Sequence, residues 1–244
     1  MRLNRVYCAA PLAPGAEFDL PESAATHVAR VLRLREGAII VAFDGRGDDH
    51  RCEILAVRGD RVRVRVEERV AAVPESPLAV TLVQAVSRGE RMDLTLQKAT
   101  ELGVTAIVPV LSARSVVRLD ADQAARKLRH WQAVVASAAE QCGRSVLPSL
   151  CAPVDLERHL AAPAGAATRL VPHPGAAQPL ARIDAPAGGV ELLVGPEGGF
   201  EDAEVANAIA AGYRTVSLGP RVLRTETAGM VAITVLQALA GDLR

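Results

Sequence analysis

The sequence predicts an α/β protein in two parts, a small β domain followed by a domain whose largely parallel sheet is covered on both faces. Its 244 residues suit one large or two modest domains. The hydrophobic period changes along the chain, from strand-like alternation to strands separated by helices. Only 2% of the residues are aromatic, so both cores must be aliphatic.

The segment 73–77, Val-Pro-Glu-Ser-Pro, marks the boundary between the two parts. Proline fixes its own φ, lacks an N–H donor and restricts the preceding residue to extended conformations, which is typical of linkers. We therefore predict domains over residues 1–72 and 78–244. In the first, residues 61–66 alternate arginine and valine, as in a strand with one solvent-facing side. Further strands over 38–43 and 52–57 and a helix over about 23–32 complete a small barrel.

After the linker, strands and helices alternate. The predicted strands cover 78–86, 106–110, 167–171, 191–194 and 215–218. The predicted helices cover 92–102, 122–141, 201–211 and 225–239. Strands separated by helices of this length are typical of a parallel sheet buried on both faces.

Charge and cysteine content exclude several classes. Lysine and arginine balance aspartate and glutamate at 28 each, unlike a protein that coats nucleic acid by bulk attraction. The four cysteines lack metal-ligand spacing, so we expect no metal and a reducing compartment. No apolar run approaches the roughly 18 residues of a membrane span, and no signal segment is evident. We therefore expect a cytoplasmic protein without a membrane partner.

Two loops follow predicted strands, where open α/β sheets bind ligands. Residues 195–200, Gly-Pro-Glu-Gly-Gly-Phe, match neither the ATP nor the dinucleotide fingerprint, and a tight turn alone would also explain the glycines. Residues 218–228 place Arg221 and Arg224 before a helix, where the helix dipole disfavours cations. Thr225 or Thr227 capping the helix, with Glu226 complementing its dipole, is the structural alternative. Capping does not explain Arg221 and Arg224, so we interpret the two arginines as functional residues.

These two loops resemble the signature of the RsmE family, SPOUT-class methyltransferases that methylate N3 of a uridine in 16S ribosomal RNA. Further matches are Arg5-Val6-Tyr7, residues 27–33 (His-Val-Ala-Arg-Val-Leu-Arg) and residues 91–104, which contain Gln-Lys-Ala-Thr-Glu-Leu-Gly-Val. The resemblance runs nearly end to end. It implies a PUA-like β-barrel, a deep-trefoil-knot methyltransferase domain, a homodimer and the cofactor S-adenosyl-L-methionine (SAM).

The resemblance also implies site residues. The cofactor would contact Val171, Pro172, His173, Gly195, Pro196, Glu197, Gly198, Gly199, Leu218, Gly219, Leu223, Arg224, Thr225, Glu226, Thr227 and Ala228. The RNA would contact Arg5, His27, Arg30, Arg33, Arg114 and Arg144. Methylation of N3 requires loss of its proton, so we expect Arg224 or Arg221 to stabilise the uracil anion. Glu197 and Glu226 are candidate proton acceptors, although each also suits a structural role.

Three other functions stay open. A related knotted methyltransferase could act on a ribose 2′-hydroxyl or on transfer RNA. A non-catalytic RNA-binding assembly factor could keep the fold, and a hydrolase could use His173, although no serine or cysteine elbow accompanies it. Outside the loops, we expect packing roles for His130 and Trp131 and a surface ion pair between Lys98 and Glu101.

Overall fold

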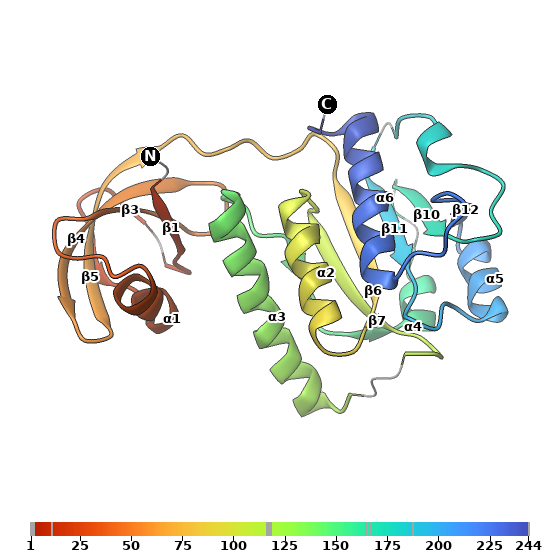
Figure 1. The fold of residues 1–244 in the computed structure, drawn as a ribbon, viewed down its shortest axis with the longest axis horizontal. Coiled ribbons are helices and arrows are strands. Elements are labelled where there is room, and N and C mark those ends of the chain that lie inside the picture. The colour runs from red at the N-terminus through yellow and green to blue at the C-terminus, as the bar shows by residue number, and fades with distance from the viewer. Residues whose placement is uncertain are drawn as a thin grey trace. The chain divides into compact units, whose positions relative to one another are not determined.

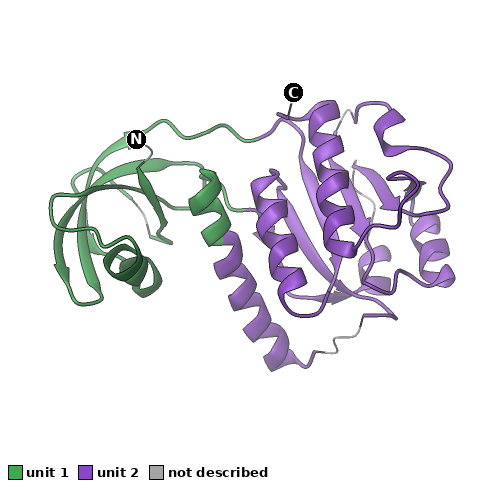
Figure 2. Cartoon of the chain, in the orientation of Figure 1, with its two compact units in different colours: residues 1–75, 136–147 green, residues 76–135, 148–244 purple. Residues whose placement is uncertain are grey.

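The computed structural model describes residues 3–10, 12–115, 119–163, 165, 167–186 and 188–243. Contacts divide the chain into two compact units (Figure 2). The first comprises residues 1–75 together with 136–147, and the second comprises 76–135 and 148–244.

The first unit contains a five-stranded sheet in the order β1-β3-β4-β5-β2. Its strands are β1 (Asn4–Tyr7), β2 (Glu17–Asp19), β3 (Ile39–Phe43), β4 (Asp49–Arg58) and β5 (Arg61–Val70). Only the β1–β3 pair is parallel, and the other three are antiparallel. In β5, Val62, Val64 and Val66 are buried while the arginines between them are exposed, which confirms the predicted alternation.

The predicted helix over 23–32 is present but divided. It comprises α1 (Glu22–Thr26) and a π-helical turn, η1 (His27–Val31). Ala24, Ala25 and Val28 face the core of the unit. Arg33 ends the segment with φ of 53°, a left-handed conformation usually taken by glycine. Sequence periodicity does not distinguish the extra residue of a π-turn from a regular helix.

The second unit is built on a seven-stranded sheet in the order β12-β10-β11-β6-β7-β8, and β9 also pairs with β7. The strands are β6 (Val80–Ala85), β7 (Ala106–Leu111), β8 (Ser149–Leu150), β9 (Val154–Asp155), β10 (Thr168–Pro172), β11 (Val190–Val194) and β12 (Arg214–Val216). Every pairing is parallel, as predicted. All carboxyl ends therefore lie along one edge of the sheet.

Helices cover both faces of this sheet (Figure 1). The helices that follow β6 along the chain are α2 (Glu90–Glu101), α3 (Ala121–Cys142), whose last seven residues belong to the first unit, α4 (Leu156–Leu160), α5 (Asp202–Ala210) and α6 (Thr225–Ala240), with a 3-10 turn, η2 (Leu180–Arg182). Helices α2 and α6 lie side by side on one face. Leu156 of α4 and Ala208 of α5 join Val83 and Leu193 in the core on the other. None of the described helices combines the length and apolar composition needed to cross a membrane.

Six short elements were not predicted from the hydrophobic pattern: β1, β2, β8, β9, α4 and η2. Each has two to five residues, too few to show a hydrophobic period. Tertiary pairing makes them regular: β2 pairs with β5, and β8 and β9 pair with β7. The longer elements agree with the prediction within three residues at either end, apart from β5, which extends to Val70.

Candidate active site

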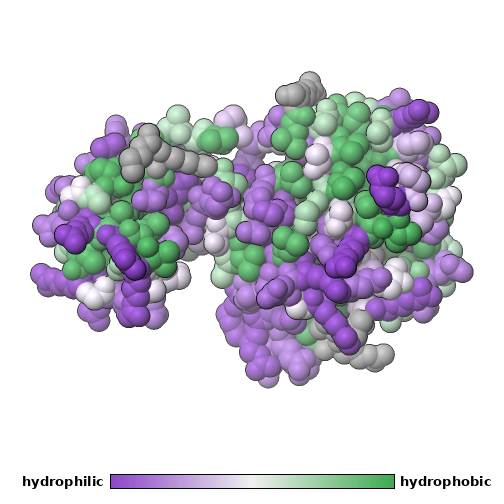
Figure 3. Space-filling model, in the orientation of Figure 1, coloured by the Kyte–Doolittle hydropathy of each residue, from purple (hydrophilic) through white to green (hydrophobic). Residues whose placement is uncertain are grey.

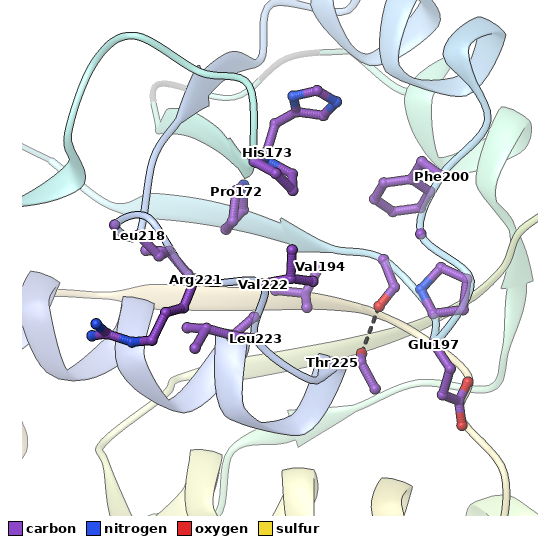
Figure 4. A pocket seen from close by; sticks show the side chains of 16 residues that line it. Pro172, His173, Val194, Glu197, Phe200, Leu218, Arg221, Val222, Leu223 and Thr225 are labelled. Atoms are coloured by element: carbon purple, nitrogen blue, oxygen red, sulfur yellow. Dashed lines mark hydrogen bonds between the residues drawn. The ribbon is translucent and has the colours of Figure 1, made fainter.

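A pocket of about 310 Å³ lies in the second unit (Figure 4). Three segments line it: residues 172–174 after β10, residues 194–200 after β11 and residues within 218–228 after β12. Each segment follows the carboxyl end of a strand. The three strands are neighbours in the sheet, so loops far apart in sequence converge on one cavity.

Glycines shape the loop over residues 195–200. Gly199 has φ of +68°, which a residue with a side chain rarely adopts. A Cβ at Gly195 would lie 3.2 Å from the ring of Phe200, which turns toward the pocket in Figure 4. The loop then leads into α5, whose first turn is closed by a capping box between Glu201 and Glu204. Glycine at 195 therefore lets the loop backbone pack closely against the Phe200 ring, which a larger residue would have to displace slightly.

Glu197 contributes its backbone to the pocket wall, but its carboxylate points away from the cavity (Figure 4). The carboxylate accepts hydrogen bonds from Arg91 Nη1 at 2.8 Å and from the Arg88 backbone N–H at 3.2 Å. Burial raises the pKa of Glu197, but hydrogen bonds from its own backbone, Arg91 and Arg88 outweigh burial and lower it overall. A paired carboxylate with a lowered pKa is a poor proton acceptor, so Glu197 anchors the loop.

The first turn of α6 forms the facing wall. We expected Thr225 or Thr227 to cap this helix, but Arg224 is the N-cap and no side chain caps the helix. The Thr225 hydroxyl instead donates to the Gly195 carbonyl at 2.5 Å, drawn in Figure 4. It also accepts a hydrogen bond from Gln84 Nε2 at 2.9 Å. The capping prediction was wrong because the hydroxyl has a tertiary partner 30 residues away.

Most of the residues expected at the cofactor or catalytic site line the pocket. These are Pro172, His173, Gly195, Pro196, Glu197, Gly199, Leu218, Gly219, Arg221, Leu223, Thr225 and Ala228. The expected residues outside the lining are Val171, Gly198, Arg224, Glu226 and Thr227. Val171 belongs to the core that α4 and α5 cover, and the Glu226 side chain is buried. Four further residues line the pocket: Pro174, Val194, Phe200 and Val222. Phe200 and Val222 lie within the two predicted loops but were not named as site residues, and Pro174 and Val194 each adjoin a predicted residue.

The two candidate anion-stabilising arginines occupy different positions. Arg221 lines the pocket, with its guanidinium extending outward over α6 in Figure 4. Arg224 is exposed at the N-cap of α6, outside the lining. Across from them, His173 Nδ1 accepts a hydrogen bond from the Gly175 N–H at 3.2 Å. A neutral His173 therefore carries its hydrogen on Nε2, and within the described chain no serine or cysteine hydrogen-bonds to this ring.

The residues expected to contact RNA are not equivalent. Arg5 is buried in a salt bridge with Asp49 and also donates to the Arg144 carbonyl and Ser145 hydroxyl, both at 3.1 Å. The Arg144 side chain is buried against Glu75. Both guanidiniums stabilise the first unit, so their placement argues against direct RNA contact. Sequence alone does not show the acidic partners of Arg5 and Arg144, so the expectation treated both as available for RNA. Their direct contact with RNA stays a prediction that this placement disfavours.

The other expected RNA contacts are more accessible. Arg30 is exposed but paired with Asp60, and His27 is half-buried close to Glu140. Arg33 is exposed, and no ion pair or hydrogen bond to its side chain occurs among the described residues. In the second unit, Arg114 donates to the Gly198 carbonyl at 3.1 Å, so its guanidinium supports the pocket loop.

Of the remaining expectations, the pair between Lys98 and Glu101 is present at 2.8 Å. Trp131 is buried, but His130 is exposed and hydrogen-bonds to Asp93 at 2.8 Å, so the packing role expected of His130 was wrong. Within the described ranges, no three His, Cys, Asp or Glu side chains cluster as metal ligands.

The fold and pocket define an α/β RNA methyltransferase, and comparisons with known proteins agree. A family described as an RNA methyltransferase domain matches residues 74–237, and one described as an RNA methyltransferase PUA domain matches residues 20–67. The chain belongs to the family of ribosomal RNA small subunit methyltransferase E. Relatives of that name in Mycobacterium tuberculosis and Bacillus subtilis are 38% and 31% identical, covering 87% and 92% of this chain and 83% and 93% of their own.

Two solved structures are similar over the whole of both chains. One is a Legionella pneumophila protein solved with bound SAM, 38% identical with a TM-score of 0.96. The other is the Neisseria gonorrhoeae ribosomal RNA small subunit methyltransferase E bound to SAM, 39% identical with a TM-score of 0.92.

Proposed function

We propose that this protein transfers a methyl group from SAM to N3 of a uridine in 16S ribosomal RNA of the small ribosomal subunit. The observation that carries the proposal is the convergence of residues 172–174, 194–200 and 218–228 on one pocket. Relatives of 38% and 39% identity that hold SAM support the choice of cofactor. Its substrate follows from the name shared by the curated relatives.

The residues present suit this cofactor. The cavity falls within the size range of small-molecule sites, roughly 300–1,000 Å³. Val194, Leu218 and Leu223 provide apolar walls, and the glycine-rich loop exposes backbone to a ligand. The first turn of α6, which lacks a side-chain cap, leaves N–H groups for carboxylate or ring acceptors. When bound, SAM supplies an electrophilic methyl group on its sulfonium.

The chain must orient the base and stabilise it without the N3 proton. We assign anion stabilisation to Arg221, which lines the pocket, with Arg224 as a second cation nearby. A nearby guanidinium lowers the pKa of an acidic group by favouring its anion. Glu226 remains the candidate proton acceptor: it lies outside the lining but directly follows Thr225, which lines the pocket, and its buried Oε2 has no hydrogen-bond partner among the described residues. Glu197 is not assigned as the proton acceptor, because its carboxylate already accepts hydrogen bonds from Arg91 and from the Arg88 backbone N–H.

The proposal extends to the fold and assembly. The first domain, residues 1–72, would be a PUA-like barrel that recognises RNA, and residues 78–244 a trefoil-knotted methyltransferase domain. The PUA-domain match supports the first assignment. Pairing of Ser217 with Gln178 and Leu180, which brings the segment before α6 against an earlier loop, supports the second. Because ribosomal RNA is the substrate, the proposed site of action is the cytoplasm.

A homodimer completes the proposal. Among the small residues of α6, Gly229 and Ala232 are buried within the second unit, whereas Ala238 is exposed. Their spacing along the helix puts the half-exposed Val231 and Val235 on one face with Ala238. The surface over α6 is largely hydrophobic in Figure 3. This face supports association through α6.

A methylation assay tests the function. The protein is incubated with labelled SAM and either naked 16S RNA or intact small subunits from a strain lacking the modification. Mass spectrometry then identifies the methylated nucleotide. We expect 3-methyluridine at one position. A 2′-O-methylated ribose would indicate the related methyltransferase class, and absence of both SAM binding and methyl transfer would indicate a non-catalytic RNA-binding factor.

A further inference from the structure

Gln84 is a fully buried polar residue in a mostly apolar strand. It is 0% exposed, lies near the carboxyl end of β6 and pairs in register with Val194 of β11. Leu82 and Val83 before it belong to the aliphatic core. Burying an amide costs free energy unless its polar atoms are hydrogen-bonded, so an amide at this position calls for a specific reason.

The Gln84 side chain begins a directed chain of hydrogen bonds. Its Nε2 donates to Thr225 Oγ1 at 2.9 Å and to the Ala85 carbonyl at 3.1 Å. Flipping the amide would place Oε1 against the Ala85 carbonyl oxygen, so the orientation is determined. Because the Thr225 hydroxyl accepts from Gln84, its hydrogen can donate to the Gly195 carbonyl at 2.5 Å.

The last bond of this chain, from Thr225 to Gly195, connects two walls of the pocket (Figure 4). Gly195 begins the loop over residues 195–200, and Thr225 begins α6; both line the cavity. The hydroxyl that holds Gly195 is the one expected to cap α6. Its use in the tertiary bond fixes the spacing of the walls and leaves the first turn of the helix free to meet a ligand.

We propose that Gln84 is a positioning residue of the SAM site: acting through Thr225, it sets the separation between the loop over residues 195–200 and the first turn of α6. The proposal rests on the function proposed above. Gln84 Oε1 is buried and, among the described residues, lacks a hydrogen-bond partner. An apolar side chain of similar length would fill the strand without that penalty, which argues against a purely structural role.

The test compares variants of the full-length protein. Gln84→Met removes the amide at similar length, Thr225→Val removes the hydroxyl at the same shape, and Thr225→Ser keeps it. Thr234→Val is the matched control, because among the described residues the Thr234 hydroxyl bonds only the Met230 carbonyl within α6, at 2.8 Å. SAM affinity is measured by calorimetry, thermal stability by Tm, and turnover as separate KM and kcat values.

We expect Gln84→Met and Thr225→Val to weaken SAM binding by roughly tenfold, mainly through KM. Thr225→Ser should stay within about twofold of wild type, as the small side chain keeps the hydroxyl bond, and Thr234→Val should bind normally. Absence of SAM binding by wild type would overturn the proposed function and this inference together. Normal binding by Thr225→Val, or losses that simply follow Tm in every variant, would overturn the inference alone. If Gln84→Met does not fold, the comparison of SAM affinity between Thr225→Val and Thr225→Ser decides whether the inference holds.

Discussion

Arg91 and Glu197 lie 106 residues apart in the sequence and meet at 2.8 Å beside the pocket. Arg91 belongs to the first turn of α2, and Glu197 to the loop that follows β11. On the other flank of this loop, Arg114 bonds the Gly198 carbonyl. Two arginines from different parts of the second unit therefore hold one glycine-rich loop in place.

The first prediction separates loop anchoring from proton transfer. Arg91→Ala should weaken SAM binding roughly two- to fivefold, the effect of losing a partly exposed ion pair. Glu197→Gln should lower kcat by less than about tenfold, whereas loss of a general base costs about 10²–10⁴-fold. Calorimetry and steady-state kinetics measure the two effects. Lys98→Ala is the control, because its ion pair on the same helix is similarly exposed. A kcat loss of a hundredfold or more in Glu197→Gln would restore Glu197 as the base.

The second prediction concerns the buried salt bridge in the first unit. Arg5→Met leaves the Asp49 carboxylate buried without its partner, so the free energy of unfolding should fall by about 3–5 kcal/mol. Arg30→Met breaks an exposed, solvent-screened pair with Asp60 and should leave the free energy of unfolding nearly unchanged. Urea titration measures both. Equal losses in the two variants would refute the structural role assigned to Arg5.

The third prediction sets stability against RNA binding at Arg33. The Arg33 backbone has a left-handed conformation, which glycine adopts without strain. Arg33→Gly should therefore raise the free energy of unfolding by about 1 kcal/mol. The same change removes an exposed cation that has no ion-pair partner among the described residues, so RNA affinity should fall and its salt slope decrease by about 1. Filter binding at several salt concentrations measures this slope. Arg46→Gln is the control, as Arg46 is exposed at the β3–β4 turn. Unchanged RNA affinity would remove Arg33 from the interface.

The fourth prediction is a pH dependence of stability from Glu191. Burial raises the pKa of Glu191, but hydrogen bonds from His159 and Tyr213 and the charge of Arg169 together lower it below its usual value. The unfolded state, with a glutamate pKa of about 4.3, therefore binds the proton first as pH falls. The stabilisation is present above that pH and lost as pH decreases through the folded pKa.

Glu191→Gln removes this contribution. Between about pH 5 and pH 3, its unfolding free energy should decline less steeply than that of wild type. Glu157→Gln, at an exposed position on α4, should keep the wild-type slope. Urea unfolding at a series of pH values gives the slopes, and identical slopes for Glu191→Gln and wild type would contradict the prediction.

The fifth prediction concerns the cysteines. Burial raises the pKa of Cys8 to about 12 and that of Cys52 to about 11. Since the thiolate is the reactive form, both should resist iodoacetamide at pH 8, while the exposed Cys151 reacts. Mass spectrometry of the alkylated protein measures each site, and the urea-unfolded chain serves as the control for full reactivity. Labelling of Cys8 as fast as Cys151 would show that the first unit opens readily.

Much of the fold could be predicted because its signals are local. The alternation over residues 61–66 identified β5, and the strands and helices after the linker appear in the predicted order. The helix predicted over 23–32 is divided instead, because a π-turn depends on packing against the core and not on periodicity. Strands of two residues, such as β8, become regular only through their pairing with β7.

The sequence by itself determined where the pocket loops lie, because glycines and proline after a buried strand encode a loop at the carboxyl edge of a parallel sheet. It also carried the resemblance that names the family. Only the tertiary structure decided which polar groups are free to act. Glu197 meets Arg91, Arg5 meets Asp49 and Thr225 meets Gln84 across long separations, and no local pattern encodes such pairs. A side chain's role depends on its partner, and folding supplies the partner.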